Sequence, residues 1–128
     1  MEFVTSIHCI DGRIQEKINK YLKEKYNAKY IDSITEPGPC YALADQNDED
    51  IVRSILRKVD ISINKHGSKV IAISGHYDCA GNPVSKEAQE EHIKDSLKFL
   101  KSEYKDKDVE IIGFYINDDW EVEEELTL

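Results

Sequence analysis

The hydrophobic and polar positions of this chain follow two different periods in turn along almost its whole length. Four short runs rich in apolar and β-branched residues are typical of strands, at 3–8, 30–34, 69–75 and 109–116. Between them, apolar residues recur every three or four positions, which predicts amphipathic helices from about Gly12, over 47–67 and from Ser85. The predicted order is therefore an alternation of strands and helices.

Turn-forming residues between these runs set the limits of the elements. Asn47 or Asp48 can cap the second helix. Pro37-Gly38-Pro39 follows the second strand, and it can neither continue a ladder nor begin a helix interior, so segment 35–47 is predicted to be a long loop. Residues 121–128 alternate enough to predict a short fifth strand at the edge of the sheet.

This alternation predicts an α/β fold with a mainly parallel, doubly wound sheet of four to five strands and helices on both faces. The simplest strand order is 2-1-3-4, with the C-terminal segment as a possible fifth strand. A length of 128 residues suits one domain, taken as 1–128. In such a sheet the connections after strands 1 and 3 leave toward opposite faces, so a ligand is expected to bind where these two strands end.

Charge and composition narrow the classes of partner. The chain has 26 acidic and 17 basic side chains and a formal net charge of −9, which argues against a general affinity for nucleic acid. No run approaches the length of a membrane span, and the N-terminus lacks the features of a signal peptide. We therefore expect a cytoplasmic protein with no membrane partner. Three cysteines in a reducing compartment favour a metal site or a free thiol over a disulfide.

Two short clusters carry most of the chemistry. Cys9-Ile10-Asp11-Gly12-Arg13 follows the first strand, and His76-Tyr77-Asp78-Cys79 follows the third. Because the ends of these strands should be neighbours, Cys9, His76 and Cys79 can converge on one ion. Two thiolates and an imidazole are a zinc ligand set that leaves the fourth position for water. Each residue alone would be interpreted as an ordinary buried or loop residue, so the predicted zinc site depends on their convergence.

The two clusters resemble the zinc-site motifs of the β-class carbonic anhydrases, which have Cys-x-Asp-x-Arg after one strand and His-x-x-Cys after another. The resemblance covers roughly residues 3–116. It implies the same three zinc ligands, with Asp11 and Arg13 as a catalytic dyad beside the metal. It also implies a zinc lyase that hydrates carbon dioxide reversibly to bicarbonate by zinc-bound hydroxide. Zinc can provide this hydroxide because it lowers the pKa of its bound water to about 7.

A carboxylate two residues from a metal ligand has two roles open to it. Asp11 could coordinate zinc and close the site, or accept a hydrogen bond from the zinc-bound hydroxide. The planar guanidinium of Arg13 can hold Asp11 in the second role, whereas the plainer interpretation is a solvated ion pair. No proton shuttle is identified, because strand alternation turns His8 away from the site and His66 and His92 are expected at a helix end and a helix surface.

The sequence departs from the family pattern in two places. Family members usually carry N-terminal helices that grip a partner subunit and line the substrate pocket, whereas this chain begins at the first strand. After the second strand the family commonly has an Arg-Asn-Ala-Gly type segment, where residues 33–40 stand here. A non-enzymatic zinc- or anion-binding module on the same scaffold is therefore the alternative function. A homodimer is possible without these helices but not required.

The cysteines and the fold admit three further interpretations. Cys40 could be a fourth ligand in a closed structural site of three cysteines and one histidine. Cys9 could instead be a thiolate nucleophile, although Asp11 would repel an anion there and Arg13 follows too closely for a phosphate-cradling loop. A flavodoxin-like fold that binds an organic cofactor is disfavoured, because the first loop lacks the glycines or hydroxyls that would hold phosphate.

Overall fold

The computed structural model describes residues 2–123, 126 and 127 of the chain. The elements are, in order, β1 (Phe3–His8), α1 (Gln15–Tyr26), β2 (Tyr30–Thr35), α2 (Pro39–Asp45), α3 (Glu49–Asn64), β3 (Val70–His76), α4 (Lys86–Glu103) and β4 (Glu110–Ile116). The four strand predictions are confirmed, and their bounds agree with the predicted runs to within one residue.

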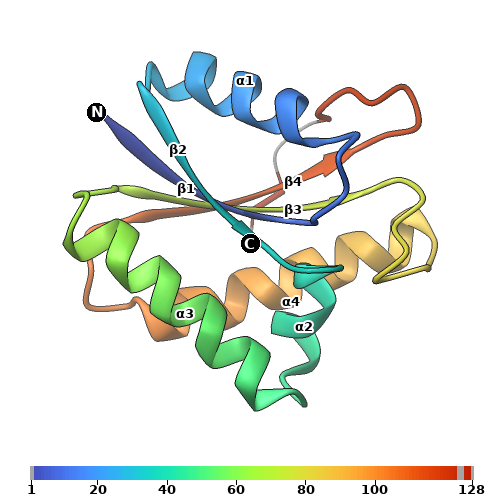
Figure 1. The fold of residues 1–128 in the computed structure, drawn as a ribbon. Coiled ribbons are helices and arrows are strands. Elements are labelled where there is room, and N and C mark those ends of the chain that lie inside the picture. Colours follow the sequence, from blue (N-terminus) through green and yellow to red (C-terminus); the bar gives the residue numbers. More distant parts are fainter. Residues whose placement is uncertain (1, 124–125, 128) are drawn as a thin grey trace.

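The four strands form one parallel sheet in the order β2-β1-β3-β4, which confirms the predicted topology. Helix α1 covers one face of the sheet, while α2, α3 and α4 cover the other (Figure 1). The chain thus leaves β1 toward one face and leaves the neighbouring β3 toward the opposite face. This arrangement places the carboxyl ends of β1 and β3 side by side, as expected for a ligand site in a doubly wound sheet.

An apolar layer lies on each face of the sheet. On one side Ile18 and Leu22 of α1 pack on the sheet, and on the other Ile55 of α3 and Leu97 of α4 do so. All four side chains are fully buried, and each such burial contributes about 1.5–3 kcal/mol. Strand β3 is buried at every position because it lies inside the sheet and between helices. This burial fixes the position of the strand that leads into the His76–Cys79 motif.

The starts of the two longest helices follow the predicted capping chemistry. The carboxylate of Asp48 accepts a hydrogen bond from the Ile51 N–H at 3.2 Å, and the hydroxyl of Ser85 accepts one from the Ala88 N–H at 3.1 Å. Asp48, rather than Asn47, is therefore the cap of α3. Among the described residues, no helix is both long and apolar enough to cross a membrane.

Helix α2 corrects the prediction of a long loop over 35–47. Gly38 precedes the helix in a left-handed conformation, with φ of 55°, and Pro39 occupies its first turn. A proline is tolerated there because its missing N–H would have no partner inside the helix. The Pro-Gly-Pro sequence therefore starts a short helix instead of preventing one.

The predicted fifth strand lies only partly within the described residues, because 124, 125 and 128 fall outside them. In the described part, Val122 and Leu126 form isolated antiparallel bridges with Ile116 and Gly113 of β4. Gly113 and Leu126 exchange two backbone hydrogen bonds of 3.0 and 2.7 Å. Val122 and Leu126 thus lie against the edge of β4, without a continuous strand among the residues described.

Candidate metal centre

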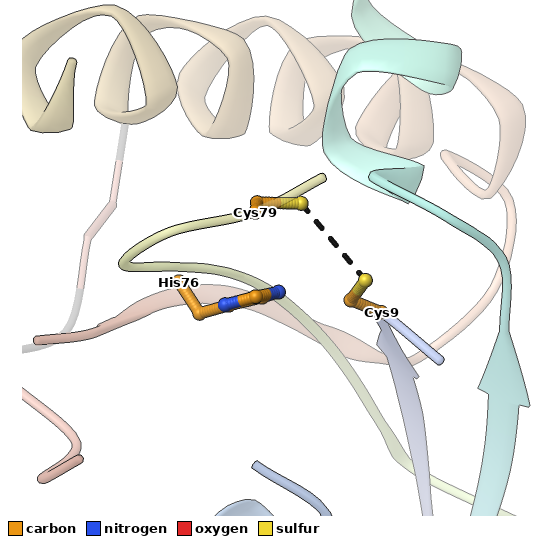
Figure 2. Close-up of side chains that lie close together, drawn as sticks. All are labelled: Cys9, His76 and Cys79. Carbon is orange, nitrogen blue, oxygen red and sulfur yellow. Dashed lines mark hydrogen bonds between the residues drawn. The ribbon is translucent and has the colours of Figure 1, made fainter. Parts of the chain in front are cut away.

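The ends of β1 and β3 bring together three side chains that can bind a metal. Cys9 directly follows β1, His76 is the last residue of β3, and Cys79 lies in the turn after it. Their ligand atoms all lie within 4.8 Å of one another and all three side chains are buried (Figure 2). The two sulfur atoms are 3.9 Å apart, close to the roughly 3.8 Å expected for two thiolates on a tetrahedral zinc.

The imidazole of His76 is oriented as a metal ligand would be. Its Nδ1–H donates to the backbone carbonyl of Tyr77 at 2.7 Å, which leaves Nε2 unprotonated in the neutral ring. Nε2 is buried and has no hydrogen-bond partner. An unpaired buried acceptor costs about 1–3 kcal/mol, and a metal ion on Nε2 would remove that cost. The donor set and this orphaned nitrogen therefore fit a bound zinc ion.

The two thiols share one negative charge in the metal-free arrangement. The Cys79 thiol donates to the Cys9 sulfur, which lowers the pKa of Cys9 and raises the pKa of Cys79. The neighbouring His76 ring and the backbone N–H groups of Gly38 and Asp11 also favour the Cys9 thiolate and so lower its pKa. Zinc binds cysteine as the thiolate, so a bound ion would replace the shared proton.

Arg13 holds the carboxylate of Asp11 beside this cluster. Its Nη2 donates to Oδ2 at 2.7 Å and its Nε donates to Oδ1 at 3.1 Å, so the two groups form a forked pair. These hydrogen bonds lower the pKa of Asp11 to about 2, so the carboxylate is ionised at neutral pH. Its Oδ2 is 3.9 Å from the Nε2 of His76. Arg13 also donates to the side chain and carbonyl of Asp78, at 3.2 and 3.1 Å, and so bridges the two motifs.

Two glutamines that the sequence analysis missed fix the backbone of both motifs. Gln15 of α1 donates through Nε2 to the carbonyls of Cys9 and Asp11 at 2.9 and 2.8 Å. Gln89 of α4 donates to the carbonyl of His76 at 2.6 Å and accepts from its N–H at 3.0 Å. A polar residue on an otherwise apolar inward face is a detectable signal for Gln89, four residues before Ile93. Gln15 carries no comparable signal.

None of the three histidines considered as proton shuttles belongs to the metal-ligand group. His8 is fully buried, donates to the Oε1 of Gln15 at 2.8 Å and accepts from the hydroxyl of Ser6 at 2.7 Å. Burial lowers the pKa of His8, so the neutral ring orients Gln15. His66 and His92 each bond a side chain outside the ligand group.

Cys40 stays outside the metal-ligand group. It is buried in α2, where its sulfur accepts from the Nδ2 of Asn82 at 3.7 Å and burial raises its pKa to about 11. Within the described residues, the group that could hold a metal consists of Cys9, His76 and Cys79. The structure therefore gives no support to a closed site with Cys40 as a fourth ligand.

Comparisons with known proteins agree with this arrangement. A family model described as "Putative carbonic anhydrase" matches residues 1–125. The fold is similar to that of one of two tetrameric β-carbonic anhydrases from the filamentous ascomycete Sordaria macrospora. That match has a TM-score of 0.65 and 11% sequence identity, and it covers 98% of this chain and 80% of the other.

A second solved structure with the same architecture is the β-carbonic anhydrase CafA of the fungal pathogen Aspergillus fumigatus. Here the TM-score is 0.62 and the identity 12%, with 96% of this chain and 74% of the other covered. No curated protein matches the chain. Because the family model spans nearly all of the sequence, this chain belongs to the carbonic anhydrase family that the model describes, and its fold is that of the β-class enzymes.

Proposed function

We propose that this protein is a zinc-dependent carbonic anhydrase that converts carbon dioxide and water reversibly to bicarbonate. The observation that carries the proposal is the three-ligand cluster with the orphaned Nε2 of His76 facing the Asp11 carboxylate. Zinc held by these ligands would act as a Lewis acid that provides a water-derived nucleophile at neutral pH. The family match supports carbon dioxide as the substrate.

Asp11 would orient the water molecule that enters this site. An ionised carboxylate only accepts hydrogen bonds, so it selects a neighbour that presents an O–H group. Arg13 already occupies both oxygens of Asp11, and Oδ2 is the oxygen that lies near His76. That oxygen keeps a lone pair for a water at the fourth position, and the forked pair restrains the carboxylate from moving onto the metal itself.

The remaining contacts would keep the ligands ready for metal. Because Nδ1 of His76 bonds the Tyr77 carbonyl, the neutral ring presents an unprotonated Nε2, the state in which imidazole binds metal. Gln89 fixes the backbone of His76, and Gln15 fixes the segment from Cys9 to Asp11. The ligand side chains are at most 4% exposed, which limits competition from bulk water.

We also infer that two or more subunits associate around this site. Ile10 and Tyr77 lie within the two motifs and are 59% and 48% exposed, so both side chains are accessible to a partner subunit. The Sordaria macrospora enzymes with this fold are tetrameric. Light scattering during size-exclusion chromatography measures the oligomeric state. A monomer at every concentration would rule out subunit association without affecting the proposed reaction.

Metal analysis combined with a stopped-flow assay of carbon dioxide hydration tests the proposed activity. Wild-type protein should bind one zinc per chain and hydrate carbon dioxide, and Cys9→Ser should lose both. Asp11→Asn should retain zinc and lose roughly 10- to 100-fold in kcat/KM, because the acceptor beside the fourth position is weakened. Cys40→Ala is the matched control, since it removes a buried cysteine outside the ligand group and should retain zinc.

The same experiment separates the competing functions. Stoichiometric zinc without hydration at any pH up to about 9 would leave a zinc- or anion-binding module. Protein that takes up no zinc, when prepared without chelators, would contradict both functions.

A further inference from the structure

The guanidinium of Arg13 is held by an aromatic ring as well as by carboxylates. Its Cζ atom lies 4.5 Å from the centroid of the Trp120 ring. The Arg13 side chain is 48% exposed, so water weakens its ion pairs with the carboxylates. A cation is also attracted to the face of an indole ring. Trp120 is therefore a second contact that places the guanidinium, beside the carboxylates.

Trp120 reaches Arg13 from a well-defined turn after β4. Its N–H donates to the carbonyl of Asn117 at 2.9 Å, and the side-chain oxygen of Asn117 accepts from the N–H groups of Asp119 and Glu121 at 2.9 and 3.1 Å. Glu121 pairs with Lys17 of α1 at 3.4 Å. These contacts fix the turn on the α1 side of the sheet, next to the metal-ligand group.

The backbone of Trp120 has a conformation that normally favours glycine. Its φ is 59°, a left-handed conformation that is rare for bulky residues. Glycine would satisfy the turn without this strain. The indole packs against Arg13 and near the rings of Tyr77 and His76, at centroid distances of 6.2 and 6.5 Å. The strained residue thus makes its ring contacts with the two metal-site motifs.

We propose that Trp120 is a positioning residue that keeps Arg13 on Asp11 and so prevents Asp11 from becoming a fourth metal ligand. This inference depends on the function proposed for the site. Asp11 Oδ2 is only 3.9 Å from the metal-facing nitrogen of His76, so a small movement would bring it within reach of a bound ion. The forked pair with Arg13 opposes that movement, and the indole covers one face of the guanidinium that forms the pair.

Azide binding to the cobalt-substituted protein tests this role without an activity assay. Cobalt(II) in place of zinc gives a visible spectrum, and azide should perturb it where a coordination position is open. We expect Trp120→Gly to weaken azide binding roughly two- to fivefold, because Asp11 then competes for that position. Trp120→Gly suits the left-handed turn, so it should fold. Trp120→Phe keeps an aromatic face and should retain most of the wild-type affinity.

The Trp120→Gly substitution in an Asp11→Asn protein tests whether Trp120 acts through Asp11 or whether its removal disturbs the metal site in general. In that background Trp120→Gly should no longer weaken azide binding, because the competing carboxylate is absent. An equal loss in both backgrounds, or no loss in either, would overturn the role of Trp120 while leaving the metal site intact. Tyr30→Ala removes an aromatic residue on β2 that is 51% exposed, and serves as the control. A wild-type protein that takes up no cobalt would overturn the proposed function and this inference together.

Fluorescence of the metal-free protein provides an independent measurement, since Trp120 is the sole tryptophan of the chain. Arg13→Ala should make the indole more accessible to quenching by acrylamide, because the guanidinium covers its face. Arg53→Ala on α3 removes an exposed arginine elsewhere and should change nothing. Equal quenching of Arg13→Ala and wild-type protein would overturn the contact on which the proposal depends.

Discussion

At the scale of single residues, Gln89 connects the chemistry of the site to the stability of the fold. It satisfies both backbone groups of His76, so Gln89→Leu would leave a buried N–H and a buried carbonyl unpaired. We expect a loss of about 2–4 kcal/mol in the free energy of unfolding and a 10- to 100-fold loss in zinc affinity. Urea unfolding and competition with a chelator measure the two effects.

A control for Gln89 lies on the same helix. Glu91→Leu makes a polar-to-apolar change on the exposed side of α4 and should alter both quantities little. Gly75 belongs to the same contact, because a Cβ there would lie 2.5 Å from the Oε1 of Gln89. Gly75→Ala should therefore resemble Gln89→Leu, and a Gly75→Ala protein with normal zinc affinity would contradict this account.

Cys40 provides a pH-dependent prediction at a residue outside the metal-ligand group. Burial raises the pKa of its thiol from 9.0 to about 11, so between these values the folded state binds more protons than the unfolded state. Its contribution to stability is complete below pH 9 and is lost as the pH rises toward 11. Relative to Cys40→Ala, wild-type protein should lose on the order of 1–2 kcal/mol between pH 7.5 and 10.5.

Urea unfolding of wild-type and Cys40→Ala protein across this pH range provides the measurement. The comparison cancels the titration of other groups, because both proteins contain them. The smaller side chain of the variant adds a constant offset that does not depend on pH. Parallel stability curves for the two proteins would show that the Cys40 thiol ionises equally well in the folded and unfolded states.

At the scale of elements, local patterns predicted every strand but did not predict α2. The strands are recognisable because each is a run of apolar residues, and β3 is nearly free of polar interruptions because both its faces are buried. Helix α2 is seven residues long and begins at Pro-Gly-Pro, so both its length and its composition are typical of a loop. Its position depends on Gly38 meeting Gly81, a contact between segments far apart in the sequence.

In the candidate site, too, residues that belong to local patterns were predictable and residues placed by tertiary contacts were not. Cys9, His76 and Cys79 were predictable because two motif spacings and one strand order suffice to bring them together. Gln15 and Trp120 were not, since neither belongs to a recognisable pattern. Their roles arise from tertiary hydrogen bonds and ring contacts that no local period encodes.

The contact between Gly38 and Gly81 gives a prediction for the turn that carries Cys79. A Cβ on Gly81 would lie 2.5 Å from the carbonyl carbon of Pro37 and 2.7 Å from the nitrogen of Gly38, so the backbone would have to move. We expect Gly81→Ala to cost about 1–3 kcal/mol in unfolding and to weaken zinc binding. Gly12→Ala is the matched control, because a Cβ on Gly12 meets nothing within 4 Å.

Calorimetry with zinc and thermal unfolding measure these two effects. A Gly81→Ala protein that unfolds and binds zinc like Gly12→Ala would show that the two loops can separate at little cost. Because the start of α2 packs on the turn of the second motif, we expect Gly81→Ala to be less stable and to bind zinc more weakly than Gly12→Ala.

At the scale of the whole molecule, the metal ligands join parts of the chain that are distant in sequence. Cys9 and Cys79 are separated by 70 positions, and α1, β2, α2, α3 and β3 lie between them. The ladder between β1 and β3 pairs only three residues of each strand, Thr5 to Ile7 with Ile71 to Ile73. A metal ion at the ends of these strands would add a cross-link where the ladder has already ended.

Zinc should therefore stabilise the fold as a whole, because a site built from two distant segments does not exist in the unfolded chain. Free zinc at 100 times its Kd should add about 2.7 kcal/mol to the free energy of unfolding, with further gains as its concentration rises. Melting curves at a series of buffered zinc concentrations should show a rising Tm for wild-type protein and a constant Tm for Cys79→Ser. Repeating the series at several protein concentrations separates this effect from subunit association, which would also raise Tm. A wild-type Tm that does not change with zinc concentration would mean that Cys9, His76 and Cys79 do not bind zinc in the folded state.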